Sequence, residues 1–167
     1  MSKTKRLAAA AILAGLALVT FVIESQIPPP LPLPGIRLGL ANLYTLMAVS
    51  LLGRKEAGAV LLIRILLGSL FCGTLLSLLY SAAGGLLCYL VTALLYPALG
   101  DRLLWAVSVI SALAHNLGQL LVAYFAVGHA VLAYAPVLAI AAVAAGTAVG
   151  LLASLLAPIL KKRALRP

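Results

Sequence analysis

Residues 7–23 read LAAAAILAGLALVTFVI, an unbroken apolar run that follows a short basic tail. About 20 apolar residues in a helix are needed to cross the hydrocarbon core of a bilayer. The run is longer than the apolar region of a secretory signal peptide, and polar residues 24–26 and prolines follow it where a cleavage site would have small residues. The stretch therefore predicts a first transmembrane helix that is not cleaved.

The rest of the chain has the same character. Of its 167 residues 65% are hydrophobic and 9% are charged, and its mean hydropathy is +1.21. A soluble domain cannot hide so much apolar surface, because its exterior has to be polar. The apolar runs are continuous rather than alternating, which argues against a transmembrane β-barrel. We therefore expect an all-α membrane protein, a single domain of about six transmembrane helices near residues 7–25, 39–53, 57–71, 73–96, 103–127 and 130–159.

The basic residues are distributed unevenly. The net charge is +9, but the chain has no basic stripe interleaved with aromatic residues, as a nucleic-acid-binding surface would have. With six spans, ten of the twelve Lys and Arg residues fall on one side of the membrane, Arg37 falls on the other, and Arg64 lies within a helix. Because cytoplasmic loops carry the excess of Lys and Arg, both termini are expected in the cytoplasm. Two Cys and two separated His residues give no cluster of metal ligands.

Arg64 needs an explanation, because a cation in the middle of an apolar helix is costly unless it faces a cavity or a partner. Of the three acidic residues, only Glu24 lies outside the expected cytoplasmic turns. A Glu24–Arg64 pair requires the helix at 57–71 to sit high or to tilt, because the two residues are expected at different heights. Three roles stay open for Arg64: contact with an anionic or carbonyl-bearing ligand, a structural pair with Glu24 or backbone carbonyl groups, and snorkelling to the interface.

Polar residues also gather on the helix expected at 103–127. Ser111, His115 and Gln119 are four residues apart and share one face, and Asn116 is adjacent. Such a cluster provides either interhelical hydrogen bonds or the polar wall of a substrate pocket. His115 also titrates near neutral pH in its unperturbed form, which leaves proton coupling open.

The prolines among residues 28–34 form a stiff, extended connection, because proline lacks the N–H group that a helix needs. Arg37 and Asn42 follow them at the expected outer mouth of the helix at 39–53. The connection is therefore either a lid over this mouth or a plain connector.

Small residues recur every four positions in several helices, which lets helix backbones approach closely in lipid. The sets at 73–85 and 142–154 favour packing within the bundle. Two pairs in the first helix suit either the bundle or a docking partner: Ala10 with Ala14, and Ala11 with Gly15.

Four segments together resemble one bacterial family. They are PGIRLGLAN at 34–42, RILLGSLF at 64–71, YSAAGG at 80–85 and AHNLGQ at 114–119. By them the chain is identified as a member of the Gx transporter family, also called heptaprenyl diphosphate synthase component I. That family looks like the substrate-binding S components of energy-coupling factor (ECF) transporters, which are six-helix bacterial plasma membrane proteins with both termini inside.

The resemblance implies a ligand and a partner. S components bind a vitamin-like molecule near the outer face. They dock through a small-residue face of the first helix on an energising module of one membrane subunit and two ATPases. By this resemblance Ala10 and Ala14 are the docking candidates, with Ala11 and Gly15 beside them.

The synthase part of the family name does not lead us to expect catalysis. Prenyl diphosphate synthases hold Mg²⁺ and diphosphate with clustered aspartates, whereas this chain has one aspartate, Asp101. It has no P-loop, so it is not expected to hydrolyse ATP. No cofactor is expected.

We therefore expect a non-enzymatic membrane transport protein, an S-component-like subunit for uptake of a small amphipathic molecule of vitamin or quinone type. The expected substrate-binding residues are Arg64, His115, Asn116 and Gln119, with Arg37 and Asn42 near the mouth. Two alternatives stay open: a non-catalytic membrane subunit associated with heptaprenyl diphosphate or menaquinone synthesis, and a stand-alone secondary carrier.

Overall fold

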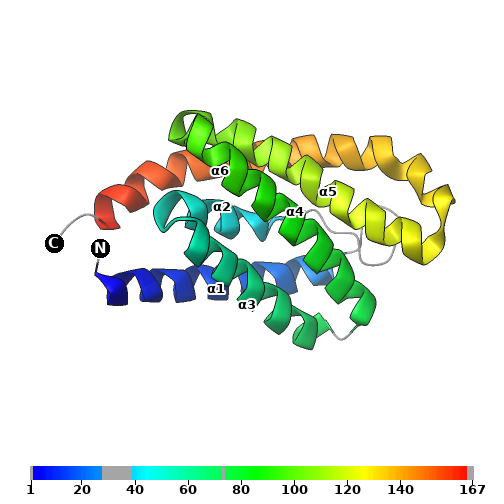
Figure 1. The fold of residues 1–167 in the computed structure, drawn as a ribbon, viewed down its shortest axis with the longest axis horizontal. Helices are drawn as coiled ribbons and strands as arrows, with labels where there is room; N and C mark the ends of the chain where they lie inside the picture. Colours follow the sequence, from blue (N-terminus) through cyan, green and yellow to red (C-terminus); the bar gives the residue numbers. More distant parts are fainter. Residues whose placement is uncertain (1, 28–38, 73, 165–167) are drawn as a thin grey trace.

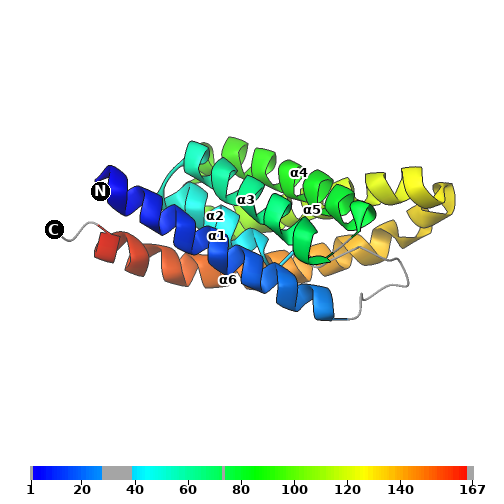
Figure 2. The same ribbon diagram turned by 90° about the horizontal axis from the view of Figure 1, so that it is seen from below.

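Six α-helices make up the bundle seen in the computed structural model, which describes residues 2–27, 39–72 and 74–164 (Figures 1 and 2). No strand occurs in these described ranges, so the predicted all-α fold is confirmed. The helices are α1 (Lys3–Gln26), α2 (Asn42–Leu51), α3 (Arg54–Cys72), α4 (Leu75–Leu99), α5 (Leu104–Val127) and α6 (Ala135–Ala164). Two 3₁₀ turns, η1 (Asp101–Leu103) and η2 (His129–Tyr134), precede α5 and α6.

Two of the helix boundaries that differ from the expected ones involve proline. α4 was expected to end at Pro97 but continues to Leu99, and Gly100 ends it with a φ of +59° and an N–H bonded to the Tyr96 carbonyl. α6 begins at Ala135 rather than near residue 130, because Pro136 occupies its first turn, where a missing N–H is tolerated.

Four segments are long and apolar enough to cross a membrane: α1, α4, and α5 and α6 each with the 3₁₀ turn that precedes it. This makes the chain a membrane protein; the two other described helices, α2 and α3, are shorter or more charged. α2 has 10 residues, or about 15 Å, which is half of a hydrocarbon core about 30 Å thick. α3 has 19 residues but carries four charges, three in its first turn and Arg64 in its second half.

The short helix α2 lies at the centre of the bundle. It packs against α1, α3, α4 and α6, and most of its side chains are buried. α5 lies between α4 and α6 (Figure 1). Glycines allow the α5–α6 contact: a Cβ atom on Gly146 would lie 2.8 Å from the Cα atom of Val109, and one on Gly150 would lie 2.6 Å from that of Trp105. The expected packing of the 142–154 small residues within the bundle is confirmed at these two positions.

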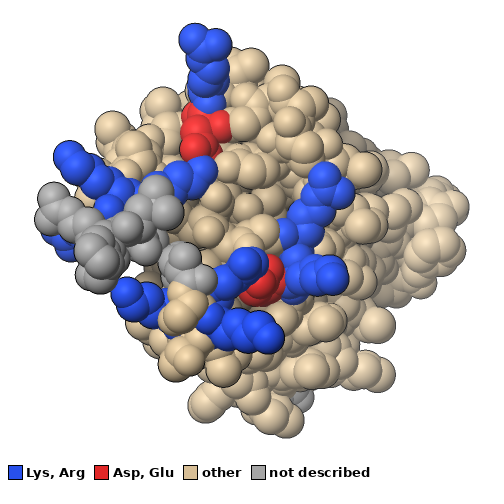
Figure 3. Space-filling model, turned by 60° about the vertical axis from the view of Figure 1, so that its left-hand side comes forward, with Lys and Arg blue, Asp and Glu red and all other residues tan. Residues whose placement is uncertain are grey.

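Both chain ends lie at one end of the bundle (Figures 1 and 2). Arg6 forms an ion pair with Glu56 at the start of α3, and Lys161 near the end of α6 forms one with Asp101 in η1. These ion pairs connect each terminal tail to a turn between helices. Figure 3 shows the lysine and arginine side chains gathered at this end of the bundle. Every described Lys and Arg except Arg64 belongs to these segments. The charge asymmetry expected from the sequence is therefore present in the fold.

Candidate functional site

A polar cavity lies between α1, α3, α4, α5 and the residue that precedes the turn into α2. Its volume is about 10 Å³, roughly the space that one water molecule needs. The residues that line it come from segments far apart in the sequence: Phe21, Glu24, Gly39, Arg64, Ser77, Ser81, His115 and Gln119.

Arg64 reaches this cavity from α3 and is 2% exposed. Its guanidinium carbon lies 5.5 Å from the centroid of the Phe21 ring on α1, within the range of a cation–π interaction. Gly85 of α4 makes room on the other side, because a Cβ atom there would lie 2.7 Å from Nη2 of Arg64. An aromatic ring and a glycine therefore hold the guanidinium group in the interior.

Glu24 brings the opposite charge to the same cavity. It lies near the end of α1, is 5% exposed, and accepts a hydrogen bond of 2.6 Å from the Gly39 N–H. Gly39 has a φ of +79°, a conformation that glycine adopts without strain. The sequence left open whether Glu24 and Arg64 lie at the same height, and the structure places both at one cavity. Burying opposite charges close together lowers the cost of burying each.

His115 and Gln119 reach the cavity from α5, one turn apart, as their spacing predicted. They are 2% and 1% exposed. The imidazole ring of His115 fits between two glycines. A Cβ atom added to Gly39 would lie 3.0 Å from Nε2 of the ring, and one added to Gly84 would lie 2.8 Å from Nδ1. Backbone on both sides therefore fixes the position of the ring.

A second cavity of about 20 Å³ also borders on Gly39. Its polar side chains are Asn42 of α2, Thr92 of α4, and Ser108 and Ser111 of α5. The hydroxyl groups of Thr92 and Ser111 are 2.8 Å apart and hydrogen-bonded. Asn42 is 8% exposed, and its Oδ1 has no hydrogen-bond partner among the described residues. The remaining lining residues are Leu46, Cys88, Ala112, Ala145, Gly146 and Val149.

Asn116 and Arg37 are the remaining expected binding residues. Asn116 donates a 2.8 Å hydrogen bond to the carbonyl of Leu138 on α6, and it lines neither of these two cavities. This hydrogen bond connects α5 to α6, which is one of the two roles that the sequence left open. Arg37 lies outside the described residues.

The four docking candidates of α1 divide into two faces. Ala14 is buried inside the bundle and Ala10 is partly buried against the same core, whereas Ala11 and Gly15 are exposed. No atom lies within 4 Å of a Cβ added to Gly15. The second pair is therefore the more exposed of the two.

Sequence reasoning missed Phe21, and it assigned Ser77 and Ser81 to a packing face. The two serines are four residues apart on α4, and they line the cavity opposite His115 and Gln119, which have the same spacing on α5. Matching polar spacing on two helices was the signal available in the sequence.

The model of the family described as heptaprenyl diphosphate synthase component I matches residues 13–156. The chain belongs to this family. The match runs from within α1 to within α6 and contains every described residue of both cavities. The family suggested by the four sequence segments is thus confirmed. No curated protein and no solved structure matches the chain significantly.

Proposed function

We propose that this protein binds a small amphipathic molecule at the Arg64 cavity and takes part in its uptake across the membrane, as an S component does. Support comes from the burial of Arg64, Glu24, His115 and Gln119 around one cavity. Charged side chains inside a membrane bundle are costly and usually mark functional sites. A few convergent polar groups in apolar surroundings are typical of a small-molecule site.

The small volume of the cavity indicates how a ligand would enter. Pockets for drug-sized ligands have volumes of roughly 300–1,000 Å³, whereas this one has about 10 Å³. A vitamin-sized ligand therefore requires the chain at Gly39 to move away, and the hydrogen bond from Gly39 to Glu24 has to break. Entry would then occur at the end of the bundle away from the termini, which fits capture from outside if both termini are cytoplasmic.

Uptake requires energy from elsewhere, and the energising module of an ECF transporter, a membrane subunit with two ATPases, is the partner we propose. Ala11 and Gly15 are exposed on α1, and small side chains allow another helix to approach closely. We therefore assign the docking role to this pair, with Ala10 and Ala14 serving the bundle's own packing.

Replacing Arg64 with alanine tests the ligand site. The purified protein in mild detergent is screened with a panel of vitamins and quinones by thermal unfolding, because a ligand that binds only the folded state raises the melting temperature. A compound that stabilises the wild-type protein should not stabilise Arg64→Ala. The matched control is Arg54→Ala, which removes an exposed arginine from the same helix at the other end of the bundle. Equal stabilisation of wild type and Arg64→Ala would remove Arg64 from the site.

A second candidate function follows from the family's description: a non-catalytic membrane subunit of heptaprenyl diphosphate synthesis. Clustered carboxylates for Mg²⁺ would be expected in a catalytic subunit, but the three acidic residues are dispersed, and Glu56 and Asp101 pair with Arg6 and Lys161. A pull-down from native membranes separates the two functions. Recovery of ATPases with a membrane subunit supports uptake, whereas recovery of a prenyl diphosphate synthase without ATPases supports the second candidate.

A further inference from the structure

Buried polar side chains follow one another along three packed helices. We call this set the polar seam. On α5 it follows a spacing of three to four residues, so its members share one face. Its members are Asn42, Thr45 and Ser50 on α2, Ser77, Ser81 and Thr92 on α4, and Ser108, Ser111, His115 and Gln119 on α5; each is at most 9% exposed.

The packing of α4 against α5 aligns the two halves of the seam. Ser77 and Ser81 line the first cavity with His115 and Gln119. Gly39 borders both cavities, and at the second one the Thr92 hydroxyl is hydrogen-bonded to that of Ser111. The polar side chains of the two helices therefore meet across their interface rather than facing lipid.

Water is the occupant that suits both cavities. Their volumes of about 10 and 20 Å³ correspond to roughly one water molecule each. Among the described residues, three buried oxygens of the seam have no hydrogen-bond partner: Asn42 Oδ1, Thr45 Oγ1 and Ser81 Oγ. Buried polar atoms normally bond to protein or to ordered water. The seam thus consists of hydroxyl groups, an imidazole and spaces of water size.

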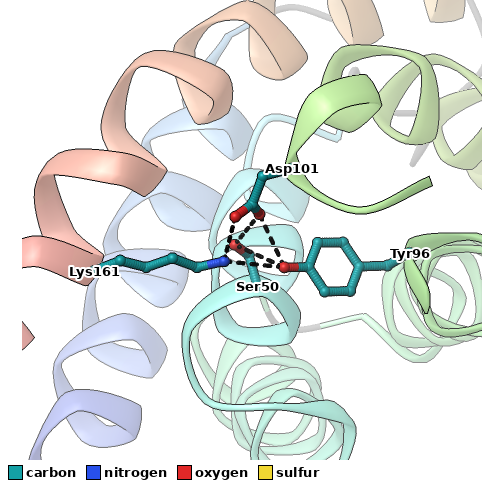
Figure 4. A network of polar contacts seen from close by, with 4 residues as sticks. All are labelled: Ser50, Tyr96, Asp101 and Lys161. Carbon is teal, nitrogen blue, oxygen red and sulfur yellow. Dashed lines mark hydrogen bonds and ion pairs between the residues drawn. The ribbon is translucent and has the colours of Figure 1, made fainter. Parts of the chain in front are cut away.

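A polar cluster of Ser50, Tyr96, Asp101 and Lys161 lies at the end of the seam that is nearer the basic tails (Figure 4). The Oδ1 atom of Asp101 accepts hydrogen bonds from Ser50 (3.0 Å) and from the Tyr96 hydroxyl (2.8 Å). Lys161 donates to the Tyr96 hydroxyl at 3.1 Å. Tyr96 follows Thr92 by one turn of α4, about 6 Å along the helix axis. The fully buried side chains of Leu104 and Val107 belong to the apolar core at this level.

We propose that the polar seam carries protons across the bundle, between Asp101 at the cytoplasmic end and Glu24 at the other. Each hydroxyl or water accepts a proton on a lone pair and passes on its own, so one proton leaves solution at one end for each that emerges at the other. The charged or titratable side chains that line the first cavity are Glu24, Arg64 and His115, and the second has only Cys88. Transfer past the apolar side chains of Leu104 and Val107 is the slowest step and limits the rate of proton transfer. This activity needs no ligand and therefore goes beyond the proposed function.

Proton flux into liposomes tests the proposal. Wild-type protein is reconstituted into potassium-loaded liposomes that contain a pH-sensitive dye, and valinomycin sets an inside-negative potential. We expect faster acidification than in protein-free liposomes. Thr92→Val combined with Ser111→Ala removes both hydroxyl groups without adding side-chain volume and breaks the relay, and we expect about tenfold slower flux, as loss of one hydrogen bond in the path implies. Thr147→Val is the matched control, because Thr147 bonds only within α6 through the Val143 carbonyl, and it should keep the wild-type flux.

A second variant keeps the test decisive if the double variant does not fold. Val107→Thr places a hydroxyl group in the apolar stretch and should increase the flux. Wild-type flux equal to that of protein-free liposomes would overturn the proposal. So would a folded double variant that conducts as wild type does. Ligand binding at Arg64 is measured in a separate experiment. A negative result for proton flux is therefore distinguishable from a failure of the proposed function.

Discussion

Gly84 shows how the lack of one side chain positions the candidate site. A Cβ atom on Gly84 would lie 2.7 Å from Cε1 of His115 and 3.0 Å from the His115 carbonyl oxygen. α4 and α5 would then have to separate. We expect Gly84→Ala to lower the free energy of unfolding by about 1–3 kcal/mol, the usual cost of overpacking, measured by thermal or denaturant unfolding in mild detergent.

Gly15→Ala is the control for this prediction. Gly15 lies on the exposed face of α1 with no atom within 4 Å of an added Cβ, and alanine favours a helix over glycine by about 1 kcal/mol. This variant should be at least as stable as the wild type. If the two variants unfold at the same temperature, the close contact between Gly84 and His115 is not important for stability.

Helical spacing predicted which residues of α5 act together, but not every direction in which side chains point. His115 and Gln119 were placed on one face because four residues make slightly more than one turn. Asn116 follows His115 by one residue, about 100° around the helix axis, and so it contacts α6. Residue spacing could not predict contacts between helices. Glu24, Arg64 and Gly39 meet because of how α1, α3 and the chain before α2 are arranged.

Arg6 connects three elements at the basic end of the bundle. Its Nη2 donates a 2.6 Å hydrogen bond to the Leu52 carbonyl at the end of α2 and forms an ion pair with Glu56 of α3. Since the pair is partly exposed, we expect Arg6→Ala to lower the free energy of unfolding by at most about 1 kcal/mol. High salt should reduce the difference, because salt screens exposed charges.

Lys5→Ala is the matched control, since it removes a neighbouring exposed cation. A double-mutant cycle of Arg6→Ala with Glu56→Gln isolates the pair from the hydrogen bond to Leu52. A coupling energy of zero would mean that the effect of Arg6→Ala comes from the hydrogen bond to Leu52 and not from the ion pair with Glu56.

The hydrophobic runs predicted which helices exist, but they did not predict the length of each helix. The run at 39–53 predicted a helix that crosses the membrane, yet α2 occupies only Asn42–Leu51. Hydrophobicity in this segment reflects burial against other helices, because α2 packs against four of them. A buried helix and a lipid-facing helix are both apolar, so composition cannot distinguish them.

At the scale of the whole molecule, the uneven charge distribution predicts an orientation. The basic tails and turns lie together at one end of the bundle (Figure 3), and Lys and Arg favour the cytoplasmic side. We expect this end in the cytoplasm and η2 outside. Cysteine labelling in intact host cells tests it after Cys72→Ser and Cys88→Ser remove the native thiols. A membrane-impermeant maleimide should label Ala130→Cys in intact cells, but label Ser2→Cys and Arg102→Cys only after permeabilisation. Labelling of Arg102→Cys in intact cells would invert the orientation and place the Glu24 cavity near the cytoplasm, which would contradict capture from outside.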